Sequence, residues 1–439
     1  MDQAKLEIIM FNMSSYSEWE SGIANRNFHI FQHLLNNPRV ERIFAIDFLP
    51  FTRKRALRNY YENIIKGPKG KVIYKDWTTK CTQINDRLYV FSTIDSIFSH
   101  QRVVEKLKLV LEKIGSLPQQ SVGRVKTVRI VWSYFPMLVD YLHPNSAPSH
   151  SSPPAGGSSH SGNPKAPIRM LNEDLTVFDA VDNWIEHPSF VKYKDLLRKN
   201  YQIIAQKSDL IFTVAEFLVD FFKKLGREKD VYWIANGVEL ENFISHLSGN
   251  GQLKDVPSPI IGYVGTIQNR VDVNLLEYLA QKNPDKSFVL IGPLWPVFLR
   301  KFRRPAIEIR RLKKYKNIYL LGRKKYQELP IYLDKFDVAI IPHRLDEFIK
   351  YTYSLKLLEF LAAGKPVVSP PISGAEKFAD LVYLAKDYRQ FNEMIQKAIR
   401  EDNPDLRRKR REAVANEDWS KKVNEMLKII DYKIKERQF

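Results

Sequence analysis

Residues 342–370, PHRLDEFIKYTYSLKLLEFLAAGKPVVSP, carry the strongest structural signal in the chain. A polar loop leads into a helix that begins near Ser354 and ends at Gly364, and Pro366 opens a further strand. The N-terminus of such a helix has unsatisfied N–H groups and the positive end of the helix dipole, so it attracts anions. The segment therefore predicts a helix between two strands, with an anion site at the start of the helix.

The same alternation of apolar strands and helices extends from this segment along most of the chain. Strands are predicted at 5–11, 41–48, 87–93, 127–132, 175–180, 209–214 and 231–236, and then at 259–265, 287–292, 317–322, 337–342, 366–369 and 381–385. Apolar strands separated by helices of ten or more residues indicate parallel sheets covered on both faces. We therefore expect an α/β protein with two doubly wound, Rossmann-like domains that face each other across a cleft.

Two polar stretches interrupt this pattern. The first, residues 144–167, holds seven Ser, six Pro and three Gly in 24 positions, and we expect a flexible loop within the first domain. The second lies between the two halves and predicts a first domain over 1–240 and a second over 241–415. The segment 416–439 is expected to form a helix that packs back on the first domain.

Composition excludes several classes of protein. The chain has 439 residues, 44% of them hydrophobic, which is enough to build packed cores. Cys81 is the single cysteine, so an intrachain disulfide framework and a cysteine-based zinc site are excluded. The first residues read as a strand and not as a signal peptide, and no run of 18 apolar residues occurs. A soluble cytoplasmic protein is expected.

The net charge of +19 is concentrated in two windows. Residues 51–75 hold eight Lys or Arg and one Glu, and residues 294–327 hold twelve Lys or Arg and one Glu. Such patches favour anionic partners: nucleic acid, anionic lipid or a phosphorylated substrate. The predicted helix 53–66 has an apolar stripe flanked by basic residues, which fits an anionic membrane surface or a helix docked on its own sheet.

Lys356 and Glu359 lie in the predicted helix after Ser354. A lysine in the first turn opposes the helix dipole, and a bound diphosphate would remove that conflict. Glu359 lies one turn on, where it could accept hydrogen bonds from vicinal hydroxyls such as those of a ribose. The alternative is an ordinary ion pair between residues three apart on a helix.

SLKLLEFLAAGKPVVSP (354–370) is similar to the donor-site signature of glycosyltransferases with the GT-B fold. GYVGTIQNRVDVNLLEYLA (262–280) resembles the opening of their C-terminal domain, and the resemblance covers most of residues 175–385. It is closest to bacterial enzymes of surface-polysaccharide synthesis, of the teichuronic-acid and xanthan-type glucuronosyltransferase kind. It implies transfer of a sugar from a nucleotide diphosphate, a UDP-sugar, to a glycan or lipid-linked acceptor. It further implies no metal, and a place in the cytoplasm or on the inner face of the plasma membrane.

The resemblance also implies roles for single residues in donor binding. Glu359 would bind the ribose, and the diphosphate would lie on Ser354, Leu355 and Lys356. Gly265 and Thr266 would line the opposite side of the donor pocket. The base would lie near Gly322, Arg323 and Lys324. Retaining members carry a second glutamate eight positions before Glu359, where this chain has Tyr351, and Asp346 or Glu347 could substitute. The family's Arg and Lys after the first strand of the second domain are out of register, although Arg270 lies close. Both departures leave the anomeric outcome open.

Acceptor activation is expected in the first domain. Asp179 and Asp182 lie at the end of a predicted strand that faces the expected cleft, and an inverting mechanism needs a carboxylate to take the acceptor proton. Asp179 is the first candidate, whereas Asp182 could instead cap a following helix. In the loop after the first strand, Gly22, Arg26 and His29 are candidates for acceptor contact.

Three other functions fit part of the sequence. A sugar-nucleotide epimerase could share the architecture and the donor site without an acceptor site. A non-catalytic sugar-nucleotide binder is consistent with the missing glutamate. A nucleic-acid-binding protein would explain the charge, but no nucleic-acid-binding motif accompanies either basic window.

Overall fold

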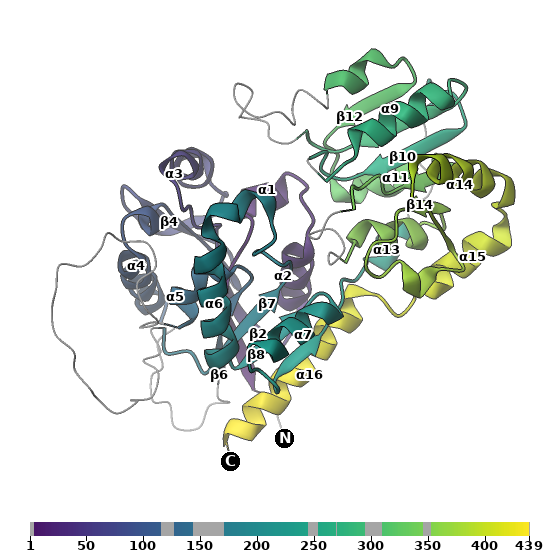
Figure 1. Cartoon of the computed structure of the whole chain (residues 1–439). Helices are drawn as coiled ribbons and strands as arrows, with labels where there is room; N and C mark the ends of the chain where they lie inside the picture. The colour runs from purple at the N-terminus through teal and green to yellow at the C-terminus, as the bar shows by residue number, and fades with distance from the viewer. Residues whose placement is uncertain are drawn as a thin grey trace. The chain divides into compact units, whose positions relative to one another are not determined.

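The computed structural model describes residues 4–115, 127–143, 171–244, 253–268, 270–294, 310–345 and 353–438. The chain divides into two compact units, each of which is an α/β structure (Figure 1). Unit 1 comprises Met1–Ser21, Arg26–Ile234 and Met426–Phe439, and unit 2 comprises Gly22–Asn25 and Ala235–Glu425. The predicted loop 144–167 lies outside the described residues.

The described part of unit 1 contains one nine-stranded sheet in the order β3-β4-β5-β2-β1-β6-β7-β8-β9. The strands are β1 (Lys5–Phe11), β2 (Val40–Ile46), β3 (Lys71–Lys75), β4 (Thr79–Asn85), β5 (Leu88–Thr93), β6 (Thr127–Ser133), β7 (Leu175–Ala180), β8 (Leu210–Thr213) and β9 (Val231–Trp233). All pairs are parallel except β3–β4 and β4–β5. Seven strands match the predicted ones, whereas the antiparallel extension β3–β4 was not predicted, because β3 is short, half-exposed and rich in lysine.

The described part of unit 1 contains the following α- and π-helices, among which α3 and η1 together match the helix predicted over 53–66. They are α1 (Tyr16–Glu20), α2 (Arg26–Asn36), α3 (Arg53–Asn59), the π-helix η1 (Tyr60–Lys66), α4 (His100–Lys113), α5 (Val139–Leu142), α6 (Lys194–Lys207) and α7 (Glu216–Lys224). Figure 1 shows α6 lying along the strands of this sheet. The last part of α16 (Trp419–Gln438) belongs to the same unit, where Asp431 pairs with Arg39 at 2.5 Å and Lys433 with Asp230 at 2.7 Å. In the described ranges no helix combines the length and the apolarity needed to cross a bilayer.

Unit 2 has a six-stranded parallel sheet in the order β12-β11-β10-β13-β14-β15. Its strands are β10 (Ile260–Val264), β11 (Ser287–Ile291), β12 (Ile318–Gly322), β13 (Val338–Ile340), β14 (Val367–Ser369) and β15 (Val382–Leu384). Its helices include α8 (Leu240–Ile244), α9 (Val273–Lys282), α11 (Leu329–Asp334), α13 (Leu355–Ala362), α14 (Tyr388–Glu401) and α15 (Pro404–Ala413). The strand order reverses between β10 and β13, which is the switch point where doubly wound sheets bind ligands.

Gly262 in β10 shows how tightly unit 2 is packed. Its neighbours Ile261 and Tyr263 point into a core shared with α9 and α14. Gly262 points to the other face, where a Cβ would overlap the ring of Phe336. Because Phe336 is buried, glycine at this position allows the turn between α11 and β13 to pack closely against the sheet.

We predict that Gly262→Ala lowers the stability of unit 2 by about 1–3 kcal/mol through overpacking. Chemical denaturation followed by circular dichroism measures the change. Gly262→Ala/Phe336→Leu should recover much of the loss, since the smaller side chain makes room for the methyl group. An unchanged unfolding midpoint in the single variant would contradict this packing.

Candidate functional site

A pocket lies at the switch point of the unit 2 sheet, with about 680 Å³ of empty volume, part of it open to solvent. Its walls come from the ends of β10, β11 and β12, from the first turns of α13 and from the segment Gly22–Ala24. That segment lies between α1 and α2 in sequence but belongs to unit 2 in space. The pocket therefore lies where parallel sheets bind ligands, beyond the carboxyl ends of the strands and beside the free N–H groups of a helix N-terminus.

Two glycines allow the strand ends to approach closely. Gly265 follows β10 with φ +147°, and a Cβ there would overlap Cε of Lys356. Gly292 follows β11 with φ +147°, and a Cβ there would overlap the carbonyl group of Gly265. At both positions the backbone conformation and the missing side chain each require glycine. Lys356 consequently lies directly over the loop after β10.

Lys356 is the principal cation of the pocket. It follows the N-cap Ser354 by two residues, and its Nζ lies 6.0 Å from the centre of the Tyr263 ring. Burial, together with the nearby charge of Arg270, lowers the pKa of Lys356 to about 8, although Glu359 opposes the shift. Lys356 and Arg270 therefore form a positive centre beside the helix N-terminus, and an anion would stabilise the charged lysine.

Glu359 is the buried carboxylate of the pocket, with 6% of its surface exposed. Burial raises the pKa of Glu359 to about 7, against the opposing effects of Lys356 and of a hydrogen bond from Tyr326. Tyr326 also lines the pocket and is buried. Glu359 is therefore oriented by a fixed neighbour while it still faces the pocket, and it can accept hydrogen bonds from hydroxyl groups of a ligand.

A second layer supports the loop after β10. The Tyr263 hydroxyl donates to the carbonyl oxygen of Thr266 at 3.3 Å, and it lies 3.5 Å from Nε2 of His343. Burial and the charges of Lys356 and Arg270 hold the pKa of His343 well below its usual value. His343 is therefore neutral and adds no charge to the pocket.

The structure brings most of the predicted donor residues together. Gly265, Thr266, Arg323, Lys324, Leu355, Lys356 and Glu359 all line the pocket. Ser354 occupies the N-cap position of α13 without a capping hydrogen bond from its side chain, and Arg270 lies close enough to influence Lys356 electrostatically. Asp346, Glu347 and Tyr351 lie outside the described residues.

Some of the pocket was not expected from the sequence. Gly22, proposed for acceptor contact, lines the same pocket as the donor residues. Tyr326, Leu329, Gly292 and Pro293 were missed. A glycine at the end of β11 was the available signal for Gly292, whereas the contact of Tyr326 with Glu359 joins residues 33 positions apart.

The predicted catalytic residues lie in unit 1, at the carboxyl end of β7. The Asp179 carboxylate has no exposed surface and accepts hydrogen bonds from Nε of Arg26 at 3.0 and 3.1 Å. Burial raises the pKa of Asp179 to about 6, although Arg26 opposes the shift. Asp182 is half-buried and is not a helix cap, because the following helix begins at Pro188. His29 is fully buried.

Comparisons with a family model and with a known protein both find similarity to glycosyltransferases. Residues 258–401 match the model of the family described as glycosyl transferases group 1. A protein of Bacillus subtilis (strain 168), TuaH, described as a teichuronic acid biosynthesis glycosyltransferase, is 26% identical over 275 residues. The match covers 59% of this chain and 67% of that protein.

Several solved structures have a similar fold, and their matches cover 97% or more of the chain. Sucrose-phosphate synthase from Thermosynechococcus elongatus has a TM-score of 0.62 at 14% identity, with 97% of this chain and 98% of that chain covered. Trehalose 6-phosphate synthase from Burkholderia multivorans has a TM-score of 0.63 at 10% identity, with 99% and 100% covered. Anabaena HepE in complex with UDP and glucose has a TM-score of 0.60 at 12% identity, with 97% and 99% covered.

The lowered pKa of Lys356 predicts pH-dependent anion binding. An anion binds the charged lysine better, so affinity for inorganic pyrophosphate should fall as the pH rises through about 8. Lys356→Met should weaken binding at pH 7 by roughly 10- to 100-fold and remove this part of the pH dependence.

Isothermal titration calorimetry of the wild type and Lys356→Met across this pH range measures the difference in their pyrophosphate affinity. The ionisation of pyrophosphate itself affects both proteins equally and therefore cancels. Lys325→Met removes a neighbouring exposed charge that does not line the pocket, and it serves as the matched control. Parallel pH profiles for wild type and Lys356→Met would contradict the assignment.

Proposed function

The protein is a glycosyltransferase with the GT-B fold, and from this premise we propose that it transfers a sugar from a UDP-sugar to a glycan or lipid-linked acceptor. The observation that carries the donor assignment is the pocket in which Lys356, Glu359 and the N-terminus of α13 converge. HepE, which has the same fold, was solved with UDP and glucose. The relative TuaH supports an acceptor in cell-surface polysaccharide synthesis.

The donor would lie along the first turns of α13. Its diphosphate would accept hydrogen bonds from the backbone N–H groups after Ser354 and from Lys356, with Arg270 adding positive charge. These cations can offset the charge that develops on the leaving diphosphate, so no metal is required by the proposal. Glu359 would accept hydrogen bonds from the ribose, and the base would lie toward Arg323 and Lys324, which line the same pocket.

Acceptor activation is assigned to Asp179. A carboxylate with a pKa of about 6 is ionised at pH 7 and close enough to neutrality to accept a hydroxyl proton. Arg26 orients both carboxylate oxygens. Because Asp179 is fully buried, its use requires that an acceptor hydroxyl displaces part of the packing around this ion pair. The half-buried Asp182 is the second candidate.

Donor binding can be tested with sugar nucleotides and the Glu359→Gln variant. A thermal-shift panel of UDP-, GDP- and dTDP-sugars should show stabilisation of the wild type that is largest with a UDP-sugar. Loss of the charged acceptor should weaken UDP-sugar binding by roughly tenfold or more, with little change for pyrophosphate. Equal losses for both ligands would mean that Glu359 acts through the charge of Lys356 and not on the ribose.

The base assignment can be tested with the pair Asp179→Asn and Asp182→Asn. If Asp179 is the base, Asp179→Asn should reduce kcat by 100-fold or more, in the range of about 10²–10⁴ that such catalysis contributes, while UDP affinity stays unchanged. Asp182→Asn should retain most of the activity. Radiolabelled sugar transfer to membrane lipid extracts measures turnover, and normal turnover in Asp179→Asn would remove that residue from the role.

A further inference from the structure

The helix α3–η1 in unit 1 has two different faces. Its inner face is docked: Ala56 and Ile64 are buried, and Asn63 donates to the Ser15 hydroxyl at 2.9 Å. On its outer face Leu57, Tyr61 and Ile65 are exposed by 73%, 55% and 53%. The apolar stripe seen in the sequence is therefore shared between the protein interior and the outer surface. Docking is therefore observed for the inner face, whereas contact of the outer face with a membrane stays a prediction.

Further exposed apolar side chains follow in the next part of the chain. Trp77, in the turn between β3 and β4, is 87% exposed, and Phe98, just before α4, is 60% exposed. Val72 of the edge strand β3 is 48% exposed. Figure 1 shows α3, β4 and α4 along one flank of unit 1. We call the exposed side chains of this region the 53–98 surface; its apolar members are Leu57, Tyr61, Ile65, Val72, Trp77 and Phe98.

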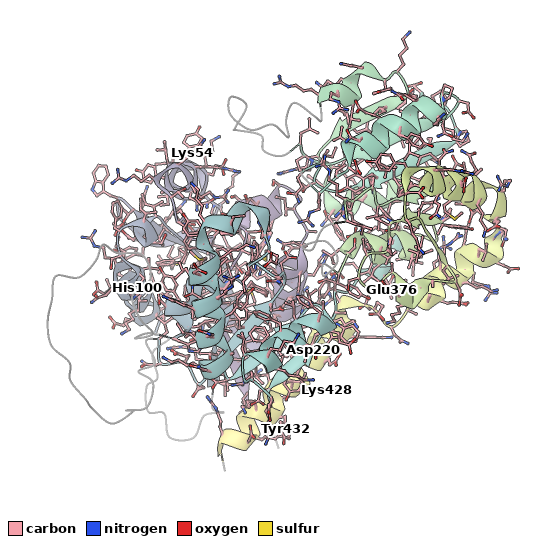
Figure 2. All side chains as sticks on the ribbon, in the orientation of Figure 1. Lys54, His100, Asp220, Glu376, Lys428 and Tyr432 are labelled. Atoms are coloured by element: carbon pink, nitrogen blue, oxygen red, sulfur yellow. The ribbon has the colours of Figure 1, made fainter. Side chains whose placement is uncertain are left out.

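The same surface is strongly basic. Arg53, Lys54, Lys66, Lys69, Lys71 and Lys75 are all exposed. Figure 2 shows Lys54 at the outer side of α3. Exposed tryptophan and phenylalanine are costly in water, whereas aromatic rings mixed with lysine and arginine are typical of the headgroup region of membranes. The positive charge selects an anionic leaflet.

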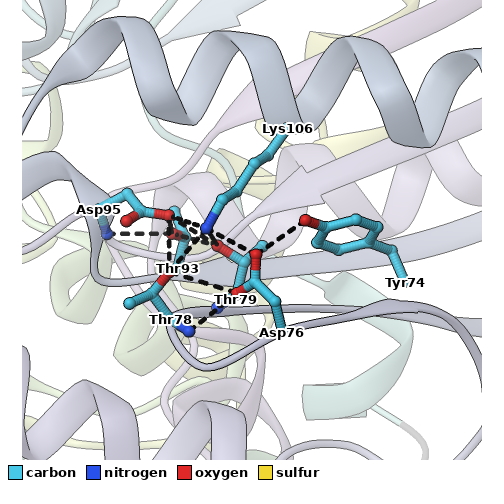
Figure 3. Close-up of polar contacts among 7 residues, drawn as sticks. All are labelled: Tyr74, Asp76, Thr78, Thr79, Thr93, Asp95 and Lys106. Atoms are coloured by element: carbon cyan, nitrogen blue, oxygen red, sulfur yellow. Dashed lines mark hydrogen bonds and ion pairs between the residues drawn. The ribbon is translucent and has the colours of Figure 1, made fainter.

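A polar cluster connects the two turns that carry Trp77 and Phe98 (Figure 3). Lys106 on α4 bonds Asp76 at 2.7 Å, in the turn that carries Trp77, and Asp95 at 2.6 Å, three residues before Phe98. Tyr74 donates to Asp76 at 2.7 Å, and Thr78 donates to Asp95 at 2.8 Å. Lys106 therefore ties both turns to α4, and this rigidity lowers the entropy cost of presenting two large side chains together.

We propose that the 53–98 surface binds an anionic membrane, with Trp77 and Phe98 inserted at the headgroup level and Lys106 acting as the residue that positions them. The inference rests on the proposed function in one respect, because a lipid-linked acceptor would be found at such a membrane. The proposal includes a second membrane contact besides the basic helix 53–66. This contact is made by the two later turns that carry Trp77 and Phe98.

The test is flotation of the full chain with vesicles of phosphatidylcholine, with and without phosphatidylglycerol. The wild type should float only with phosphatidylglycerol and less so as salt rises, because screening weakens contacts between exposed charges. Trp77→Ser/Phe98→Ser should weaken binding by about tenfold or more, since it removes the inserted side chains. Lys106→Met keeps both aromatic residues and should weaken binding by a smaller factor.

Trp233→Ser/Tyr432→Ser is the matched control. Both residues are exposed, by 47% and 64%, and neither belongs to the 53–98 surface. Figure 2 shows Tyr432 on α16, at the opposite end of unit 1 from Lys54. The control variant should float like the wild type. Quenching of tryptophan fluorescence by brominated lipid should decrease in Trp77→Phe and not in Trp233→Phe.

The proposal would be overturned if the wild type did not bind phosphatidylglycerol vesicles. It would also be overturned if Trp77→Ser/Phe98→Ser floated as well as the wild type. Either result would leave a protein partner as the occupant of the surface. Equal flotation of Lys106→Met would overturn its positioning role. UDP-sugar binding, measured on the same proteins by thermal shift, separates this result from the proposed function. Vesicle binding without UDP-sugar binding would contradict the donor assignment alone.

Discussion

The packing of Lys356 against Gly265 is the constraint on which the pocket depends. A lysine can remain in a confined site only if something offsets its desolvation, and here it lies near Glu359 and the Tyr263 ring. Gly265 provides the space for the side chain, and Gly292 provides the space for Gly265. The donor pocket therefore depends on the two glycines after β10 and β11. Because neither has a side chain, the strand ends can approach each other and Lys356 can lie over them.

This arrangement also explains the balance of charge in the site. Arg270 and Lys356 repel each other, and their charges help to keep the buried His343 neutral. Glu359 is itself close to its pKa at neutral pH. A site with this surplus of positive charge is destabilising when empty and is relieved by an anionic ligand, so part of the binding energy is stored in the unliganded protein.

The sequence predicted most of the fold because strand and helix periods are local properties. The thirteen expected strands are present, and Lys356 and Glu359 were found because a helix places residues three apart on one face. The hairpin β3–β4 was missed because β3 is short and half-exposed, and because β4, TKCTQIN, is mostly polar although seven residues long, so neither strand shows an apolar run. Tyr326 and the place of Gly22 in the donor pocket were missed because their contacts depend on how distant parts of the chain meet. Roles in catalysis stay predictions, since Asp179 was chosen by its place at the end of a strand.

The course of the chain between the two units has a consequence for its synthesis. Unit 1 begins with the first residues but includes Met426–Phe439, and unit 2 includes Gly22–Asn25. During translation unit 1 is therefore started first and completed last, with unit 2 made in the interval. Neither unit can be excised as one uninterrupted fragment, because a fragment of unit 2 would lack a wall of its pocket and a fragment of unit 1 would lack the end of α16.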